Sequence, residues 1–141
     1  MPRFVILTHT HPAWHWDVML EKEASLSTWK LHATPTGADP QSAQPLADHR
    51  LIYLDYEGTV SGDRGEVRQW DAGVFETISH DANCMVVRLS GRKLVGTAVF
   101  EKQNSTNFWT YRYVAQPVAQ SANSSANNSD TLPAGFPYQS P

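Results

Sequence analysis

Two histidines and one aspartate lie close together near the start of the chain, in the order His9-x5-His15-x-Asp17. If residues 15–21 form a strand, His15 and Asp17 project from the same face, because successive side chains of a strand alternate. Residues 10–14 contain Pro12 and are expected to turn the chain back, which brings His9 to the same place. Two imidazoles and one carboxylate leave coordination positions for water or substrate. The spacing therefore indicates an open divalent-metal site.

Nitrogen and oxygen ligands without a thiolate suit Mn²⁺, Fe²⁺, Co²⁺ or Zn²⁺, and they fit poorly with a closed structural zinc site. His11 is offset from His9 by two residues. It is a candidate for one of three roles: a spare metal ligand, a residue that supports a metal ligand, or a substrate contact. The competing interpretation is a chance cluster of histidines near a surface loop, and the spacing alone does not separate the two.

A second cluster, over residues 48–58, places His49 and Tyr53 four residues apart with carboxylates on both sides. A histidine near a metal-bound phosphate can donate a proton or act as a cationic contact. A tyrosine hydroxyl can donate a hydrogen bond to a phosphoryl oxygen. The alternative is a strand whose tyrosine and leucine side chains pack in the core, with His49 bonded to a neighbouring backbone group.

Two further stretches contain turn residues. Residues 61–66 are rich in glycine, so they form either a plain turn or a loop that brings Arg64 to a phosphate. Trp70-Asp71-Ala72-Gly73 is interpreted as a core tryptophan followed by an Asp/Gly turn.

The elements that must position these residues are mostly strands, because short apolar or alternating runs are separated by Gly, Asp, Asn and Ser. The expected strands are residues 4–7, 15–21, 26–31, 66–70, 73–78, 84–89, 94–101 and 108–114. Residues 34–47, with three prolines, are predicted to form a loop. So many short strands predict an all-β fold, a small closed or nearly closed antiparallel β-barrel with short or no helices.

A single domain is expected over residues 1–115, followed by a tail over residues 116–141. The tail is dominated by Gln, Ser, Asn, Ala and Pro, so it is predicted to be disordered. Cys84 is the one cysteine, which excludes an intrachain disulfide, and it is expected to be a buried small apolar residue. A signal peptide or membrane span is not expected, so a cytoplasmic monomer without membrane contact is predicted.

The formal net charge of −3 excludes nucleic-acid binding through overall charge alone. A nucleic-acid ligand would need a local positive patch or a bound cation.

The residues already described resemble a known family, the 3′-phosphoesterase domain of bacterial DNA ligase D. Its His-x5-His-(Tyr/Trp)-Asp-x-Arg-Leu-Glu signature is similar to His9-x5-His15-Trp16-Asp17-x-x-Leu20-Glu21. Its second signature, Asp-His-Pro-Leu-x-Tyr-x-Asp-Phe-Glu-Gly, is similar to Asp48-His49-x-Leu51-x-Tyr53-x-Asp55-Tyr56-Glu57-Gly58. Trp70-Asp71-x-Gly73 and Lys93-Leu94-x-Gly96 follow in the family's order. The resemblance covers residues 3 to 114.

This resemblance implies a small β-barrel enzyme of non-homologous end joining. Such an enzyme removes 3′-terminal ribonucleotides and 3′-phosphates from DNA ends and leaves a 3′-hydroxyl. Its metal would be Mn²⁺, with Zn²⁺ or Co²⁺ as alternatives, held by His9, His15 and Asp17. His49 and Tyr53 would be the catalytic residues at the scissile phosphate, and the partners would be nucleic-acid 3′ ends and separate repair proteins.

The chain departs from the family at two positions where the family has a cationic side chain. The family's phosphate-binding arginine is Met19 here, and the family's lysine aligns near Ala33. Methionine carries no charge and donates no hydrogen bond. The residues that could compensate as phosphate contacts are His11, His32, Arg50 and Arg64.

Three functions therefore compete. The leading one is a Mn²⁺-dependent 3′-phosphoesterase with activity weakened by Met19. The alternative is a catalytically weakened or inactive metal-binding module that recognises nucleic-acid ends or a repair partner. A third is a hydrolase of a different small phosphate ester.

Overall fold

The computed structural model describes residues 1–104 and 106–117. These residues form strands and one short 3₁₀ helix, with no α-helix among them. The elements are β1 (Arg3–His9), β2 (His15–Glu21), β3 (Leu26–Leu31), β4 (Gln41–His49), η1 (Leu51–Leu54), β5 (Gly58–Thr59), β6 (Glu66–His80), β7 (Cys84–Gly91), β8 (Val95–Lys102) and β9 (Trp109–Ala115).

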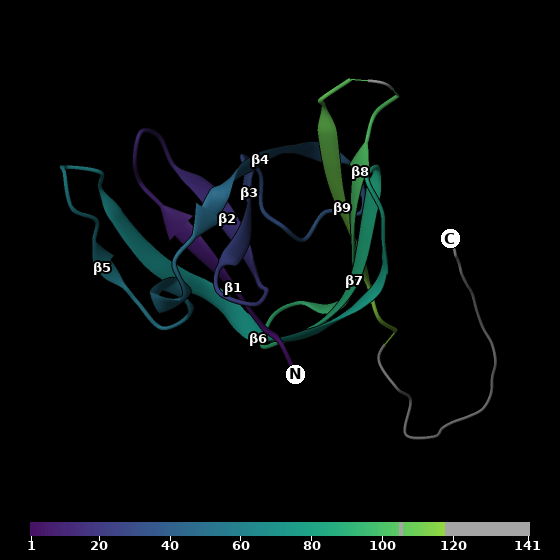
Figure 1. Ribbon diagram of the computed structural model, residues 1–141, viewed down its shortest axis with the longest axis horizontal. Coiled ribbons are helices and arrows are strands. Elements are labelled where there is room, and N and C mark those ends of the chain that lie inside the picture. The colour runs from purple at the N-terminus through teal and green to yellow at the C-terminus, as the bar shows by residue number, and fades with distance from the viewer. Residues whose placement is uncertain (105, 118–141) are drawn as a thin grey trace.

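All nine strands belong to one antiparallel sheet, in the order β1-β2-β3-β4-β9-β8-β7-β6-β5. The first half of the long strand β6 also pairs with β1, and its second half pairs with β7, so the hydrogen bonding forms a ring. Figure 1 shows β1, β2 and β3 on one side of this ring and β7, β8 and β9 on the other. The predicted nearly closed, all-β antiparallel fold is confirmed.

Side-chain alternation explains how the ring is filled. On β1, Phe4 and Ile6 enter the larger core between the two sides of the ring, whereas Val5 and Leu7 enter a second apolar cluster on the other face. On β2, Val18 joins the larger core and Met19 joins the second cluster, so Met19 lies on the face that His15 and Asp17 were predicted to share. Because β1 is covered on both faces, its sequence contains an apolar run.

The second cluster is completed by Leu54 and Tyr53 of η1. This short helix therefore covers the face of the sheet that His15, Asp17 and Met19 share. Residues 48–58 do not form a continuous strand, because β4 ends at His49 and η1 follows.

The loop predicted over residues 34–47 is wrong in its second half, where β4 begins at Gln41. The prolines favoured a loop, since proline lacks the N–H that a sheet interior needs. Pro45 is tolerated because β4 pairs with β9 only through Gln41, Ser42 and Ala43. Beyond Ala43 the strand has β3 on one side and an open edge on the other.

The turn predicted at Trp70–Gly73 is also wrong, because β6 runs through it without a break. The pairing with β1 shifts there, since Ile6 opposes Asp71 while Leu7 opposes Gln69, which leaves Trp70 as the extra residue. Asp and Gly serve tertiary contacts here instead of a turn: a Cβ atom on Gly73 would lie 2.0 Å from the carbonyl oxygen of Ser90.

Strands β2 and β3 are observed with the predicted ends, and the remaining predicted strands have ends shifted by one or two residues. Cys84 is half-buried at the start of β7, and burial among neighbouring acidic groups raises the pKa of its thiol. The tail predicted from residue 116 lies, apart from its first two residues, outside the described residues. None of the helical segments described is long and apolar enough to cross a membrane.

Candidate metal and phosphate site

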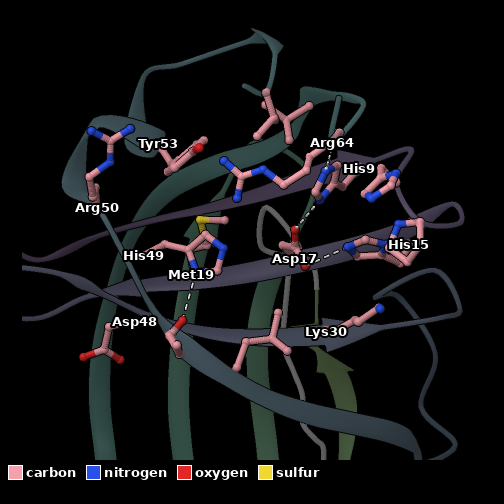
Figure 2. A pocket seen from close by; sticks show the side chains of 16 residues that line it. His9, His15, Asp17, Met19, Lys30, Asp48, His49, Arg50, Tyr53 and Arg64 are labelled. Carbon is pink, nitrogen blue, oxygen red and sulfur yellow. Dashed lines mark hydrogen bonds and ion pairs between the residues drawn. The ribbon is translucent and has the colours of Figure 1, made fainter. Parts of the chain in front are cut away.

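A pocket of about 440 Å³ lies on the face of β1, β2 and β3 beneath η1 and the β5–β6 turn (Figure 2). Eight of the residues singled out in the sequence line this pocket: His9, His11, His15, Asp17, His49, Arg50, Tyr53 and Arg64. His32 is exposed and does not line it. The structure therefore brings together side chains from residues 9 to 64 of the chain.

The metal-ligand trio is positioned by strand register. His9 is the last residue of β1 and is the direct partner of His15 at the start of β2. Asp17 follows two residues later on the same face. As a result, one ligand atom from each residue lies within 4.8 Å of the others. Ligands bonded at about 2.1 Å to one ion are at most about 4.2 Å apart, so a small side-chain adjustment completes the set.

Both imidazole rings are held by backbone carbonyls. His15 Nδ1 donates to the carbonyl of Ala13 at 2.7 Å, and His9 Nε2 donates to the carbonyl of Arg64 at 2.8 Å. A carbonyl can only accept, so these bonds assign the proton of each neutral ring to that nitrogen. The other nitrogen of each ring then carries a lone pair, which is the arrangement that metal-binding histidines show.

These lone pairs face the carboxylate of Asp17. His15 Nε2 is 3.1 Å from Asp17 Oδ1, and His9 Nδ1 is 3.3 Å from Asp17 Oδ2. Asp17 is only 2% exposed, and its Oδ1 accepts no hydrogen bond from any described residue. A buried carboxylate facing two nitrogen lone pairs is unfavourable unless positive charge lies between them. A proton on each ring or one divalent ion supplies that charge, so the residues fit a metal.

His49 and Tyr53 approach the same pocket from the other side. His49 Nδ1 donates to the carbonyl of Ala47 at 3.0 Å, which leaves its Nε2 available for a proton or a phosphate oxygen. The rings of His49 and Tyr53 meet edge to face, with centroids 5.8 Å apart. The ring is therefore bonded to a neighbouring backbone group, as the alternative expected, and it also lines the pocket.

Met19 lies in the floor of the pocket and is 1% exposed. Figure 2 shows the guanidinium of Arg64 extending across the pocket above Met19 and toward Tyr53. Arg64 Nε donates to the carbonyl of Ser61 at 2.7 Å, which fixes the side chain while part of the guanidinium remains free. An arginine from the β5–β6 turn thus points over the position where the family has one on β2.

The path of the β5–β6 turn depends on Gly65. Its φ of 76° lies in the left-handed region, and a Cβ atom there would lie 2.5 Å from Thr10 Oγ1. Glycine therefore lets this turn pack directly against the loop that carries the histidines. The same hydroxyl accepts a hydrogen bond from the backbone N–H of Glu66.

Lys30 is a pocket cation that the sequence did not single out. It is the direct partner of Asp17 across the β2–β3 pair, so both side chains lie on one face. Among the described residues, no carboxylate lies within ion-pair distance of its ammonium group. The sequence feature that points to Lys30 is its place between two apolar residues of a strand, Trp29 and Leu31. Its side chain therefore projects from the opposite face.

Charge in the pocket is predominantly positive. The second aspartate of the wall, Asp48, forms an ion pair with Lys22 at 2.8 Å. The Lys22 ammonium, with a hydrogen bond from Ser25, lowers the pKa of the Asp48 carboxyl, so it is ionised but neutralised by its partner. Lys30, Arg50 and Arg64 therefore face an anionic ligand with little opposition.

The two downstream motifs stabilise the fold, away from the pocket. The Asp71 carboxylate is fully buried and accepts backbone N–H bonds from Ala72, Arg92, Lys93 and Leu94. The Lys93 ammonium lies 4.5 Å from the centre of a Trp70 ring. Together these contacts hold the β7–β8 turn against β6.

The fold and the pocket define a small all-β domain with a candidate metal and phosphate site. Residues 7–102 match the family model of the DNA Ligase D 3′-phosphoesterase domain. The chain belongs to this family.

The multifunctional non-homologous end joining protein LigD of Mycobacterium bovis is 31% identical over 121 residues, and so is its Mycobacterium tuberculosis counterpart. Each match covers 77% of this chain and 16% of the relative. The LigD protein of Pseudomonas aeruginosa is 29% identical over 107 residues, covering 67% of this chain and 12% of the relative. The chain thus matches less than a fifth of the length of these relatives.

Proposed function

We propose that this chain is a divalent-metal-dependent phosphoesterase that acts at 3′ ends of DNA or RNA. It removes a 3′-terminal ribonucleotide or a 3′-phosphate during DNA end repair. The observation that carries the proposal is the buried Asp17 carboxylate, which faces two imidazole lone pairs at the floor of a cationic pocket. Membership of the 3′-phosphoesterase family and the end-joining names of the relatives support the same reaction and pathway.

His9, His15 and Asp17 would hold the ion, with Mn²⁺ expected and Zn²⁺ or Co²⁺ as alternatives. When bound, the ion neutralises phosphate charge and lowers the pKa of a water molecule. The buried ligands and their backbone hydrogen bonds keep three donor atoms in place before substrate arrives.

His49 and Tyr53 act on the phosphate itself. With Nδ1 bonded to the Ala47 carbonyl, His49 transfers a proton through Nε2. The Tyr53 hydroxyl donates to a phosphoryl oxygen and orients the ester. Edge-to-face packing between the two rings restricts both side chains, so little ordering is left to occur in the transition state.

Arg64 and Lys30 supply the positive charge that Met19 cannot. Arg64 presents a planar guanidinium from above Met19, and Lys30, the strand partner of Asp17, presents an ammonium group at the pocket wall. Arg50 and His11 complete the cationic lining at the pocket walls. The phosphate-binding role is therefore moved to other elements of the fold.

The function is tested with purified protein, Mn²⁺ and DNA strands that end in a 3′-ribonucleotide or a 3′-phosphate. Conversion to a 3′-hydroxyl end is expected, and it should stop when EDTA is added. Asp17→Asn should abolish it, whereas Asp39→Asn, an exposed aspartate outside the pocket, should not. No conversion at high enzyme concentration would contradict the proposal. A panel of small phosphate esters assayed in parallel detects a hydrolase of a different substrate.

Met19 favours one second function, a module that binds nucleic-acid ends without cleaving them. Arg64→Ala separates the two functions. It should lower kcat/KM about 10²–10³-fold if Arg64 stabilises the transition state, and Met19→Arg in that background should restore part of the rate. Binding of DNA ends without turnover, both by the wild type and by Met19→Arg alone, would establish the module instead.

A further inference from the structure

A second, smaller pocket of about 200 Å³ adjoins the metal and phosphate pocket. Three residues line both pockets: Arg50, Tyr53 and Val60. The wall that is not shared comes from η1, β5 and the start of the β5–β6 turn. A ligand in the smaller pocket would therefore lie directly beside a phosphate in the larger one.

A row of three rings leads from one pocket to the other. Tyr53 contacts His49 on one side, and it contacts Tyr56 on the other with centroids 5.9 Å apart and planes at 87°. The Tyr56 hydroxyl donates to the carbonyl of Thr59, which holds this ring against β5. Tyr53 thus separates the two pockets, and the same residue serves both.

The walls of the smaller pocket combine apolar, aromatic and hydroxyl groups. Ile52 is 57% exposed and adds apolar surface to this wall. Thr59 and Ser61 offer hydroxyl groups, and Arg50 offers a guanidinium that can stack on a flat ring. Aromatic and apolar surfaces take a base, and hydroxyls pair with the hydroxyls of a ribose.

The size of the pocket limits the ligand. Small-molecule sites commonly occupy roughly 300–1,000 Å³, so about 200 Å³ has room for one nucleoside and not for a run of nucleotides. The terminal nucleoside of a 3′ end is a single unit of this size, whereas the rest of the strand is a run of nucleotides and does not fit.

We infer that the smaller pocket binds the terminal ribonucleoside of a 3′ end, joined through its 5′ oxygen to the phosphate in the larger pocket. This inference rests on the proposed function, because that function places the scissile phosphate beside Tyr53. A strand that ends in a 3′-phosphate has no such nucleoside and leaves the smaller pocket empty. The two substrates therefore differ in whether they use this pocket.

The test measures binding by fluorescence anisotropy in EDTA, where turnover is not expected. The probes are two DNA strands of the same sequence with a 5′ fluorophore, one ending in a single 3′-ribonucleoside and one in a 3′-phosphate. Ile52→Ser should raise the Kd for the first probe about five- to tenfold, at the low end of the range for one base-stacking contact. It should leave the Kd for the second probe within about twofold. Ile78→Ser, at an isoleucine 46% exposed on β6 outside both pockets, is the matched control.

Thr59→Ala gives an independent readout. It should reduce the preference for a terminal ribonucleoside over a terminal deoxynucleoside, since it removes a hydroxyl that pairs with the 2′-hydroxyl. Equal effects of Ile52→Ser on both probes, no effect of either variant, or no binding of the ribonucleoside probe by the wild type would overturn the inference. If the selective effects appear but Mn²⁺ produces no turnover, the proposed function fails and the nucleoside site stands.

Discussion

Asp17 is stable in its present surroundings only when positive charge lies beside it. Its carboxylate is buried, both oxygens face ring nitrogens, and the ring protons are committed to the carbonyls of Ala13 and Arg64. A proton on each ring or one divalent ion can supply that charge, so the carboxylate costs folding free energy when neither is present, and a bound ion is expected to add stability.

Replacing Asp17 with asparagine should separate the two effects. Without metal, Asp17→Asn should unfold at the same temperature as the wild type or higher, because the amide can donate to the lone pair of His15 Nε2. With Mn²⁺ at 100 times its Kd, the wild type should gain about 2.7 kcal/mol, which the variant should lose. Thermal unfolding with and without Mn²⁺ measures both, and Asp39→Asn should behave like the wild type. An equal gain in Asp17→Asn would rule out Asp17 as a ligand.

Among the elements, β6 has the strictest steric requirements. It pairs with β1, β5 and β7, it accommodates an extra residue at Trp70, and it passes Ser90 so closely at Gly73 that a methyl group has no room. The neighbouring Asp71 collects four backbone N–H bonds from the same region. These contacts close the ring of strands on which the pocket is built.

Gly73→Ala should therefore be strongly destabilising, by about 3 kcal/mol or more, because backbone atoms must shift. Gly37→Ala is the matched control, since its added Cβ atom meets nothing closer than 3.8 Å. That change should be neutral or slightly stabilising. Urea denaturation of the two variants gives the comparison, and similar midpoints would show that β6 and β7 are less closely packed than described.

The same elements show where the sequence predicts the structure well. The apolar pattern predicts the ends of β2 and β3 to the residue, and the spacing of His9, His15 and Asp17 predicts one shared face. Pro45 and Asp71 were misinterpreted, because their usual local roles, in a loop and a turn, are replaced here by an open strand edge and a long-range contact.

Within the site, the sequence pattern predicts which residues of one strand share a face. It does not predict which residues are brought together by turns that are distant in the sequence. The sequence predicts Arg64 as a candidate phosphate contact, but it does not predict that the side chain extends over Met19. Lys30 was missed because its relation to Asp17 depends on the register between β2 and β3. The smaller pocket depends on how η1 packs beside β5, which no spacing in residues 48–61 reveals.

For the whole molecule, charge is unevenly distributed. The chain has 11 basic and 14 acidic side chains, yet the pocket presents Lys30, Arg50 and Arg64 against a single unneutralised carboxylate. A net charge of −3 repels nucleic acid at long range, while the pocket attracts phosphate at short range. Such a protein should bind the ends of nucleic-acid strands and should not bind along their length.

The salt dependence of binding should reflect only these three cations. Plotted on logarithmic axes, the association constant for a single-stranded 3′ end should fall with salt concentration with a slope of about −2. Anisotropy titrations between 50 and 200 mM salt, as a rough working range for such measurements, give the slope. Lys30→Ala should reduce its magnitude, whereas Lys102→Ala, outside the pocket, should not. A slope several times steeper would indicate a larger binding surface.

The hydrogen bond from His9 to the carbonyl of Arg64 has a consequence for cooperativity. One end of this bond belongs to a proposed metal ligand, and the other belongs to Arg64, a proposed phosphate contact. An ion that fixes the His9 ring also fixes that turn, so occupancy of one site favours occupancy of the other. Thermodynamic reciprocity then requires a phosphate end to raise the affinity for the ion by the same factor. If the proposed function holds, cation and strand end are expected to act as mutual effectors, with the domain most fully occupied when both are present.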